Sequence, residues 1–588
     1  MKNFKQIYKE ADNKITGIAA APGIVIGNVY LFSKEVLEIN GDLITDVDEA
    51  LINLNEALEK SKKELSKVVQ LAKEKMEDTR AAIFEAQVMI LDDPILIETI
   101  ANRVANEKRL PEYIVNDEIT KYQNMMRHSA ASYMKERAND IEDIKNRIIR
   151  NLQKKRWQSK IAEDVIVVSE TLTPADAILF SKRSVKGFVT DHGGLTSHAA
   201  IISRSLDIPA VVGTHNACSS ISNGDIIIVD GFHGYVIYNP TEEQIKFFRE
   251  KIEHHKILRA ELAGLKNEPA ATIDGKQINL FANVDVTGEI DLVFTNDAKG
   301  IGLYRTEQIL EETGDFPNEE EQTKIYNTLA ERLYPKTITI RAFDIGGDKV
   351  KFLDFKEPNP FLGMRGIRVL LDNINIFKTQ VKAVLRASKN KNVQLMIPMI
   401  TTLEEVRKTK ELVEICKMEL KKDKIDFDKN MRLGIMVEVP AAAVMTFDLA
   451  SEVDFISIGT NDLIQFLNAV DRGNDLVYNL YQEFSPGLIR TLAHIVSEGK
   501  RAKKTVSICG EMAADTLAIP LLVGLGLDSL SMSPTTIPYA KRIIRNCQYT
   551  DLQNLAKECL VLSSEKDITE KIEKFFRAHQ ITRTRNLI

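Results

Sequence analysis

The sequence predicts a multidomain α/β protein in which a β/α domain carries an inserted α-helical bundle and is followed by a (β/α)8 barrel. The chain has 588 residues, which is too many for a single hydrophobic core. Residues 35–151 contain almost no glycine and repeat leucine and valine at helical spacing, between two regions of short β-prone runs. After Gln277, eight short β-rich runs alternate with helix-forming segments over about 260 residues, the length typical of such a barrel.

The composition excludes several classes of protein. With 44% hydrophobic and 28% charged residues, the chain is expected to fold into globular domains. A net charge of −6 without a basic stripe argues against nucleic acid or an anionic membrane as partner. Five scattered cysteines without CxxC spacing favour reduced cytosolic thiols over disulfides or zinc. The first residues lack a signal-peptide core and no apolar run approaches the ~18 residues of a membrane span, so we expect a cytoplasmic protein without membrane insertion.

The first strands and the later strands are expected to form one domain around the helical insert. Residues 15–32 are apolar and β-prone, and short apolar, β-prone runs occur again from Asp164 onward. Breaks in the insert are predicted near Asp92–Pro94 and Leu110–Pro111, because proline starts a helix but cannot continue one. The charged faces of the insert are most simply solvated surface, with partner binding as the less favoured alternative.

A capping box at residues 241–244 predicts the start of a helical linker between the two halves of the chain. We place the domain boundaries at residues 1–34 with 152–240 for the β/α domain, 35–151 for the bundle, 241–270 for the linker and 271–588 for the barrel.

A glycine-histidine stretch over residues 193–204 stands between two predicted strands. Its two glycines allow a tight turn, and Thr196 or Ser197 is a suitable N-cap for a helix. His198 would then occupy the first helical turn, where free N–H groups favour an anion, and its imidazole is a candidate nucleophile for a phosphoryl group. The alternative is a turn, a cap and a surface histidine. Thr173 could face His198 and fix its tautomer, or it could cap the helix that follows it.

Unusual polar residues follow the predicted barrel strands, where barrel chemistry resides. Glu438 lies in an apolar run and Asp462 follows the next strand, so two carboxylates could hold Mg²⁺ with water and a substrate phosphate. Arginines at neighbouring strand ends could bind a phosphate and a carboxylate, which indicates a small phosphorylated acid. Taken singly, these residues could equally form structural ion pairs, surface charge or core. The other residues at or near strand ends are Arg305, Arg341, Asp344, Lys349, Asn461, Arg472 and Cys509.

Specific motifs in the chain resemble those of the Enzyme I family of the sugar phosphotransferase system, the phosphoenolpyruvate-protein phosphotransferases. The resemblance covers nearly the whole sequence. It implies a swivelling phosphohistidine domain, an inserted helical subdomain that docks the carrier protein HPr, and a phosphoenolpyruvate-binding barrel of the TIM type that forms a homodimer. The motifs are GIAAAPGIVIG, LTPAD, GGLTSHAAIISRSLDIPAVVGT, GIGLYRTE, DIGGDK, NPFLGMRGIR, GIMVEVPAA, SIGTNDLIQF, AVDRGND and SICGEMAAD.

The resemblance also implies a role for each candidate residue. The phosphoryl group of phosphoenolpyruvate would pass to His198 and then to a histidine of HPr, with release of pyruvate and a swivel about residues 240–270 between the two steps. Glu438 and Asp462 would hold Mg²⁺, and Cys509 would protonate the enolpyruvate carbon. Phosphoenolpyruvate would bind Arg305, Arg341, Asn461, Asp462 and Arg472, with Thr173, Asp344, Lys349 and Arg365 in supporting positions.

Two positions depart from the family pattern. Leu195 stands where Enzyme I usually has arginine, and Gln308 stands where it usually has an aromatic residue. His192 could substitute for the missing arginine beside His198. A nitrogen-type or dikinase-like relative is disfavoured, because no sensory or ATP-binding module is expected here. A catalytically idle regulatory paralogue is disfavoured because the residues of the candidate site are intact.

Overall fold

The computed structural model describes residues 13–33, 39–75, 88–127, 132–155, 164–181, 185–194, 197–313, 316–346, 357, 359–472, 474 and 476–581. The chain divides into two compact units, one up to Lys256 and one from Ile257. Among the helices of the described residues, none combines the length and the apolar character needed to cross a membrane.

An eight-stranded sheet organises the first unit, in the order β1-β8-β7-β3-β4-β5-β6-β2. Strand β3 pairs in parallel with β4, Val29 opposite Ile166, which confirms that the opening strands rejoin the later module. The middle strands are buried on both faces, as their unbroken apolar runs predict. The strands are β1 (Lys14–Thr16), β2 (Ile18–Ala21), β3 (Ile24–Phe32), β4 (Ile166–Ser169), β5 (Gly187–Thr190), β6 (Ala210–Val212), β7 (Ile226–Asp230) and β8 (Tyr235–Tyr238).

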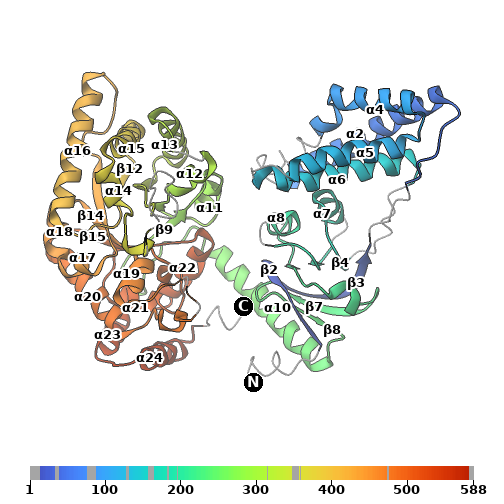
Figure 1. Ribbon diagram of the computed structural model, residues 1–588. Coiled ribbons are helices and arrows are strands. Elements are labelled where there is room, and N and C mark those ends of the chain that lie inside the picture. The colour runs from blue at the N-terminus through green and yellow to red at the C-terminus, as the bar shows by residue number, and fades with distance from the viewer. Residues whose placement is uncertain are drawn as a thin grey trace. The chain divides into compact units, whose positions relative to one another are not determined.

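Helices α7 (Pro174–Ser181) and α8 (His198–Ser205) connect the parallel strands β4, β5 and β6, and α9 (Ala217–Ser220) leads from β6 to the antiparallel strand β7. Between β3 and β4 the chain forms the helical insert (Figure 1). Its helices are α2 (Val47–Lys75), α4 (Pro94–Glu107), α5 (Pro111–Arg127) and α6 (Ser132–Leu152).

The insert has its own apolar core, and two of its helices begin at the predicted prolines. Leu54, Ile100 and Ile149 belong to that core. Helix α4 begins at Pro94, where the Asp93 side chain accepts a hydrogen bond from Ile95 N at 2.9 Å. Val68 of α2 packs among side chains of α7 and α8, so apolar contacts join the insert to the β/α part of this unit.

Helix α10 (Glu242–Gly264) begins at the predicted capping box. Thr241 N donates to Gln244 Oε1 at 2.9 Å, and Gln244 N donates to Thr241 Oγ1 at 3.2 Å. In the first unit, Phe248 of this helix packs on Ile228 and Ile237.

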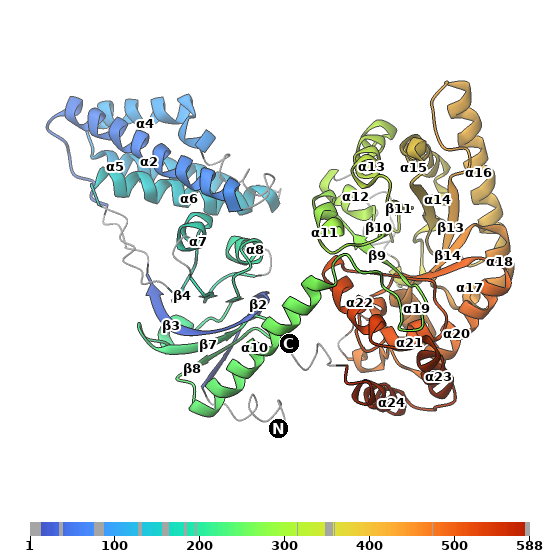
Figure 2. The same ribbon diagram turned by 180° about the vertical axis from the view of Figure 1, so that it is seen from behind.

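A closed barrel of eight parallel strands forms the centre of the second unit, which confirms the predicted (β/α)8 fold (Figure 2). Strand β16 pairs with β9, Ser529 opposite Asn279, and so closes the barrel. The strands are β9 (Asn279–Val284), β10 (Gly300–Tyr304), β11 (Thr337–Arg341), β12 (Val393–Ile397), β13 (Arg432–Val437), β14 (Phe455–Ile458), β15 (Thr505–Ile508) and β16 (Ser529–Met532).

Helices cover the outside of the barrel, and their apolar faces form one core with the strands. Because all eight strands are parallel, their carboxyl ends lie at one end of the barrel. The helices and 3₁₀ turns are η1 (Thr287–Glu289), α11 (Ile290–Thr295), α12 (Glu307–Thr313), α13 (Glu319–Leu333), η2 (Pro360–Leu362), α14 (Ile367–Asp372), α15 (Ile374–Ala387), η3 (Ser388–Asn390), α16 (Leu403–Lys422), α17 (Pro440–Val444), α18 (Thr446–Glu452), α19 (Thr460–Leu467), η4 (Tyr478–Leu480), α20 (Pro486–Arg501), η5 (Glu511–Ala513), α21 (Ile519–Gly524), η6 (Pro534–Thr536), α22 (Ile537–Arg545), α23 (Tyr549–Leu560) and α24 (Glu565–Ala578).

Candidate active site

A cavity of about 520 Å³ lies at the carboxyl ends of the barrel strands. It gathers residues that are far apart in the sequence, because they lie at or after the ends of five strands, β10, β11, β13, β14 and β15. Most of the predicted barrel residues line it. They are Arg305, Arg341, Asp344, Arg365, Glu438, Asn461, Asp462, Arg472 and Cys509. Lys349, the remaining predicted residue of the barrel, lies outside the described residues.

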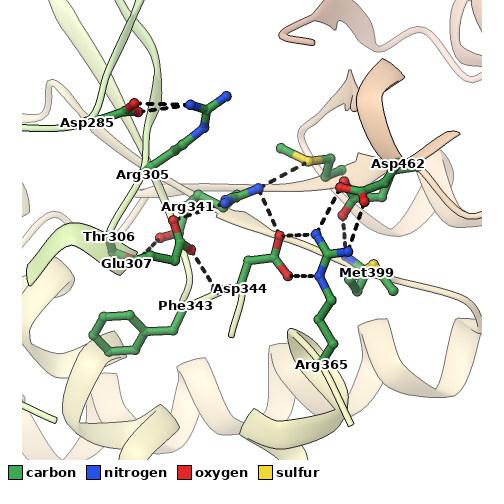
Figure 3. Close-up of polar contacts among 12 residues, drawn as sticks. Asp285, Arg305, Thr306, Glu307, Arg341, Phe343, Asp344, Arg365, Met399 and Asp462 are labelled. Atoms are coloured by element: carbon green, nitrogen blue, oxygen red, sulfur yellow. Dashed lines mark hydrogen bonds and ion pairs between the residues drawn. The ribbon is translucent and has the colours of Figure 1, made fainter. Parts of the chain in front are cut away.

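A chain of buried ion pairs crosses one side of this cavity (Figure 3). Arg341 contacts Asp344 through Nη1 at 3.1 Å. Arg365 then bridges two carboxylates: its Nε and Nη2 donate to Asp344 at 2.9 Å, and its Nη1 and Nη2 donate to Asp462 at 2.8 and 2.9 Å. Such two-point contacts fix the plane of the guanidinium group, so Arg365 holds the ends of β11 and β14 in a set geometry.

Glu307 starts this chain of ion pairs, and sequence reasoning did not select it. Its Oε2 accepts from Arg341 Nη2 at 3.0 Å, and its Oε1 accepts from Asp344 N at 2.7 Å. Its place directly after Arg305 and Thr306, at the end of the second β-rich run, is the signal that could have identified it.

The two buried carboxylates Asp344 and Glu438 have opposite pKa shifts. Burial alone would raise the pKa of Asp344, but Arg341 and Arg365 outweigh burial and the pKa lies below its ordinary value. Burial, with Asp462 and Asp344 nearby, raises the pKa of Glu438 to about 8. Arg341 and Arg365 lower the pKa of Glu438 by less than burial and the two carboxylates raise it, so a bound cation would stabilise the ionised carboxylate.

Glu438 and Asp462 fit a magnesium ion. Glu438 is 1% exposed and its Oε1 accepts from Met399 N at 2.7 Å, so the carboxylate is held at the cavity wall. The described residues contain no cluster of three or more His, Cys, Asp or Glu side chains arranged for a metal. Mg²⁺ needs no such cluster, because it is usually bound through one or two carboxylates plus water and substrate phosphate. Both oxygens of Asp462 accept from Arg365 and still retain lone pairs for a cation.

Cys509 and Asn461 also line this cavity. The Cys509 thiol is 2% exposed and donates to Ile458 O at 3.6 Å. Burial raises the pKa of this thiol to about 11, so it keeps its proton at neutral pH. Asn461 exchanges hydrogen bonds with Glu511: Glu511 N donates to Asn461 Oδ1 at 2.8 Å, and Asn461 Nδ2 donates to Glu511 Oε1 at 3.2 Å.

Figure 3 shows the Arg305 side chain pointing toward Asp285. Its Nη1 lies 3.2 and 3.1 Å from the two oxygens of Asp285. The two side chains are 34% and 48% exposed, so water screens this pair.

His198 is the first residue of α8 in the first unit. Ser197 is the N-cap, with its hydroxyl accepting from Ala200 N at 3.4 Å, as the sequence allowed. The preceding Gly193 has a φ of 123°, a value that favours glycine. The side chain of His198, together with residues 195 and 196, lies outside the described part, so the expectations for Leu195 and Thr196 fall there as well.

Thr173 acts as a helix cap in the structure. Its hydroxyl donates to Asp176 Oδ2 at 2.7 Å and accepts from Asp176 N at 3.2 Å. Of the two alternatives for this residue, these contacts match the cap.

Asp191 is a second residue that sequence reasoning did not select. It precedes the glycine turn and accepts from Thr214 Oγ1 at 2.8 Å, Ala217 N at 2.6 Å and Cys218 N at 3.1 Å. Burial opposes ionisation, but these hydrogen bonds outweigh it and lower the pKa of Asp191. The ionised carboxylate thus holds the end of β5 against the segment that starts α9.

Comparison with known proteins finds relatives along almost the whole chain. Three family models match: PEP-utilising enzyme, N-terminal, at residues 16–137, the mobile domain at 161–234, and the PEP-binding domain at 259–549. An NMR solution structure of an Enzyme I (nEIt) protein is 40% identical, covering 41% of this chain and 99% of that one with a TM-score of 0.38.

Two relatives that match over nearly their whole length are phosphoenolpyruvate-protein phosphotransferases. The one from Priestia megaterium is 40% identical over 96% of this chain and 99% of its own length. The one from Geobacillus stearothermophilus is 39% identical over 96% of this chain and 98% of its own. With a barrel cavity of this composition and relatives of this similarity, the chain belongs to the phosphoenolpyruvate-protein phosphotransferase family of PEP-utilising enzymes.

Proposed function

We propose that the protein transfers the phosphoryl group of phosphoenolpyruvate to its own His198 and then to a histidine of an HPr-type carrier, releasing pyruvate, as the first step of a sugar phosphotransferase system. The observation that carries this proposal is the cavity at the barrel strand ends, which combines arginines, two acidic residues suited to Mg²⁺ and a protonated thiol.

The arginines supply the positive charge that a phosphorylated carboxylic acid needs. Arg305, Arg341 and Arg472 line the same cavity as Asn461. The Nε of Arg341 is buried and has no hydrogen-bond partner among the described residues, so it retains a donor for an anion. Guanidinium groups bind phosphate and carboxylate oxygens in pairs, which holds the phosphoryl group ready for in-line transfer.

Glu438 and Asp462 would hold Mg²⁺ in this cavity. When bound, the ion supplies charge that offsets the negative charge on the phosphoryl oxygens during transfer. Asp344, Arg365 and Lys349 are assigned supporting positions around these ligands, and the contacts of Arg365 with Asp344 and Asp462 favour that assignment for two of the three.

In the first reaction one bond to phosphorus breaks, another forms, and a carbon atom gains a proton. The bond from phosphorus to the enol oxygen breaks as a bond from phosphorus to an imidazole nitrogen of His198 forms. The enolate that remains accepts a proton at carbon from Cys509 and becomes pyruvate. The buried thiol suits this task because it is protonated before transfer, and it regains its proton from solvent afterwards.

The second reaction passes the group from His198 to the carrier. We assign the carrier-docking role to the bundle (35–151) and the phosphohistidine role to residues 1–34 with 152–240. The linker (241–270) would permit a swivel of that domain, and the barrel (271–588) would bind phosphoenolpyruvate. Chemical cross-linking of the linker should block one half-reaction; full retention of both would refute the swivel.

A homodimer formed through the barrel is part of this proposal. Apolar side chains are exposed in the segments that follow β13 and β14: Val444 is 75% exposed and Leu476 is 89% exposed. Such side chains favour burial against a second copy.

Incubation with phosphoenolpyruvate labelled at phosphorus and Mg²⁺ tests the whole proposal. We expect acid-labile label on the wild-type protein and none on His198→Ala. The labelled protein is then mixed with a panel of HPr-type carriers of the sugar and nitrogen systems. Absence of label from the wild type, or its retention in His198→Ala, would refute the assignment, and transfer only to a nitrogen-type carrier would replace the sugar role.

A further inference from the structure

We propose that Gln380, on the outer helix α15, is a positioning residue for the phosphoenolpyruvate site. This inference rests on the proposed function of the barrel cavity. Gln380 does not line the cavity and is 0% exposed. It acts through the main chain that follows β11, where Arg341 and Asp344 are found.

Gln380 is the centre of a buried hydrogen-bond network behind the cavity wall. Its Oε1 accepts from Phe343 N at 3.0 Å. Its Nε2 donates to Thr306 Oγ1 at 3.4 Å and to Tyr326 OH at 3.3 Å. The network ends at Gln322, whose Oε1 accepts from Tyr326 OH at 3.2 Å. These four side chains come from helices α13 and α15 and from the end of β10.

The network reaches the cavity through backbone groups of the segment after β11. The Arg341 carbonyl accepts from Thr306 Oγ1 at 3.0 Å. The Phe343 N–H donates to Gln380, and the Asp344 N–H donates to Glu307. Thr306 and Gln380 thus hold the main chain from behind the cavity wall. Glu307, which lines the cavity with Arg341 and Asp344, holds it from the cavity side. Figure 3 shows Thr306, Glu307 and Phe343 beside the two cavity residues.

Because the network is buried, each of its polar groups needs a hydrogen-bond partner within the protein. Thr306, Tyr326 and Gln380 are each 0% exposed, so water cannot replace a lost partner without a cavity being opened. A glutamine supplies one acceptor and two donors at once, and all of these are used here. No apolar residue of similar shape can do the same. Loss of Gln380 would leave the Phe343 N–H without its partner. The main chain after β11 could then shift, and the Arg341 guanidinium would shift with it.

The variant Gln380→Met keeps the volume of the side chain and removes its hydrogen bonds. We expect kcat/KM for self-phosphorylation by phosphoenolpyruvate to fall by about tenfold or more, because small misplacement of a positioning group carries losses of that size. Transfer from phosphorylated His198 to HPr should be unchanged, since that step does not use the barrel cavity. A general loss of folding would impair both steps.

Asn392→Leu is the matched control. Asn392 is also a buried amide, and its Nδ2 donates to Ala330 O at 2.9 Å and to Lys336 O at 3.1 Å. It directly precedes β12, so it lies at the amino end of the barrel, opposite the cavity. Both variants should lower Tm, but only Gln380→Met should change kcat/KM for phosphoenolpyruvate.

Hydrogen exchange gives a readout that does not depend on activity. The peptide containing Phe343 and Asp344 should exchange faster in Gln380→Met and not in Asn392→Leu. The inference would be overturned if this peptide exchanged at the same rate in Gln380→Met and in the wild type, or if an active Gln380→Met protein had an unchanged kcat/KM. An inactive wild type would instead overturn the proposed function. The exchange comparison would then test the role of Gln380 without any activity measurement. If Gln380→Met does not fold, Tyr326→Phe tests the same network, with faster exchange at Phe343 expected and no change refuting it.

Discussion

Removal of Asp285 should make the protein bind phosphoenolpyruvate more tightly. Asp285 follows β9 and pairs with Arg305, one of the arginines that line the cavity. A phosphate or carboxylate bound by Arg305 must share the guanidinium group with this aspartate. The negative charge of Asp285 also repels the bound anion. In Asp285→Ala the Arg305 guanidinium is released for the substrate.

The size of the effect follows from the exposure of the pair. The Arg305 and Asp285 side chains are 34% and 48% exposed and lie 3.1 Å apart. Exposed ion pairs contribute about 0.2–1 kcal/mol. If the substrate must displace an interaction of that size, its removal lowers KM by a factor of about 1.4 to 5. The gain applies equally to substrate and transition state, so kcat should stay the same.

Steady-state self-phosphorylation at varied phosphoenolpyruvate concentration measures this effect. Asp291→Ala is the control: Asp291 forms an ion pair of similar exposure with Arg332 at 2.7 Å and does not line the cavity. Its KM should equal that of the wild type. An unchanged or increased KM in Asp285→Ala would refute the reasoning and indicate that Asp285 orients Arg305 for binding.

Three further predictions concern a proposed metal ligand, a buried acid and a glycine. Glu438→Gln keeps an acceptor for the Met399 N–H but loses the charge, so the protein should fold while the Mg²⁺ concentration for half-maximal self-phosphorylation rises about tenfold or more; an unchanged Mg²⁺ dependence would exclude Glu438 as a ligand. The pKa of Asp191 is lowered by folding, so its contribution to stability is present above the ordinary pKa of about 4 and is lost below it. Calorimetry should find that the Tm deficit of Asp191→Asn shrinks below about pH 4, and a deficit independent of pH would contradict this. A methyl group at Gly510 would clash with the Thr460 side chain and lie 2.8 Å from Thr460 N, so Gly510→Ala should unfold about 1–3 kcal/mol more easily in denaturant, whereas Gly487→Ala, with nothing within 4 Å, should not.

Local patterns in the sequence predicted the secondary structure and the fold class. Helix starts at Pro94 and at Thr241–Gln244 follow from proline geometry and capping chemistry, which act within a few residues. The eight β-rich runs indicated a barrel because their alternation with helix-forming segments, over the length typical of that fold, matches a (β/α)8 barrel. The location of the candidate site was equally accessible, since a polar residue after an apolar strand must lie at the strand end. The catalytic roles of these residues stay predictions.

Partnerships between distant residues could not be read from the sequence. Arg365 binds Asp462 although the strands β12, β13 and β14 separate the two along the chain, and Gln380 binds Phe343 across helix α14. The sequence shows that a buried carboxylate needs a partner, but not which of several cations lies within reach.

The fold class, the order of elements and the strand-end placement of the site were therefore determined by the sequence itself, because they depend on periodicity and local geometry. Only the tertiary structure decided that Asp344 is stabilised in its ionised form while the pKa of Glu438 rises to about 8. Those two outcomes depend on burial and on distances to charges from other strands, and such distances exist only once the barrel has closed.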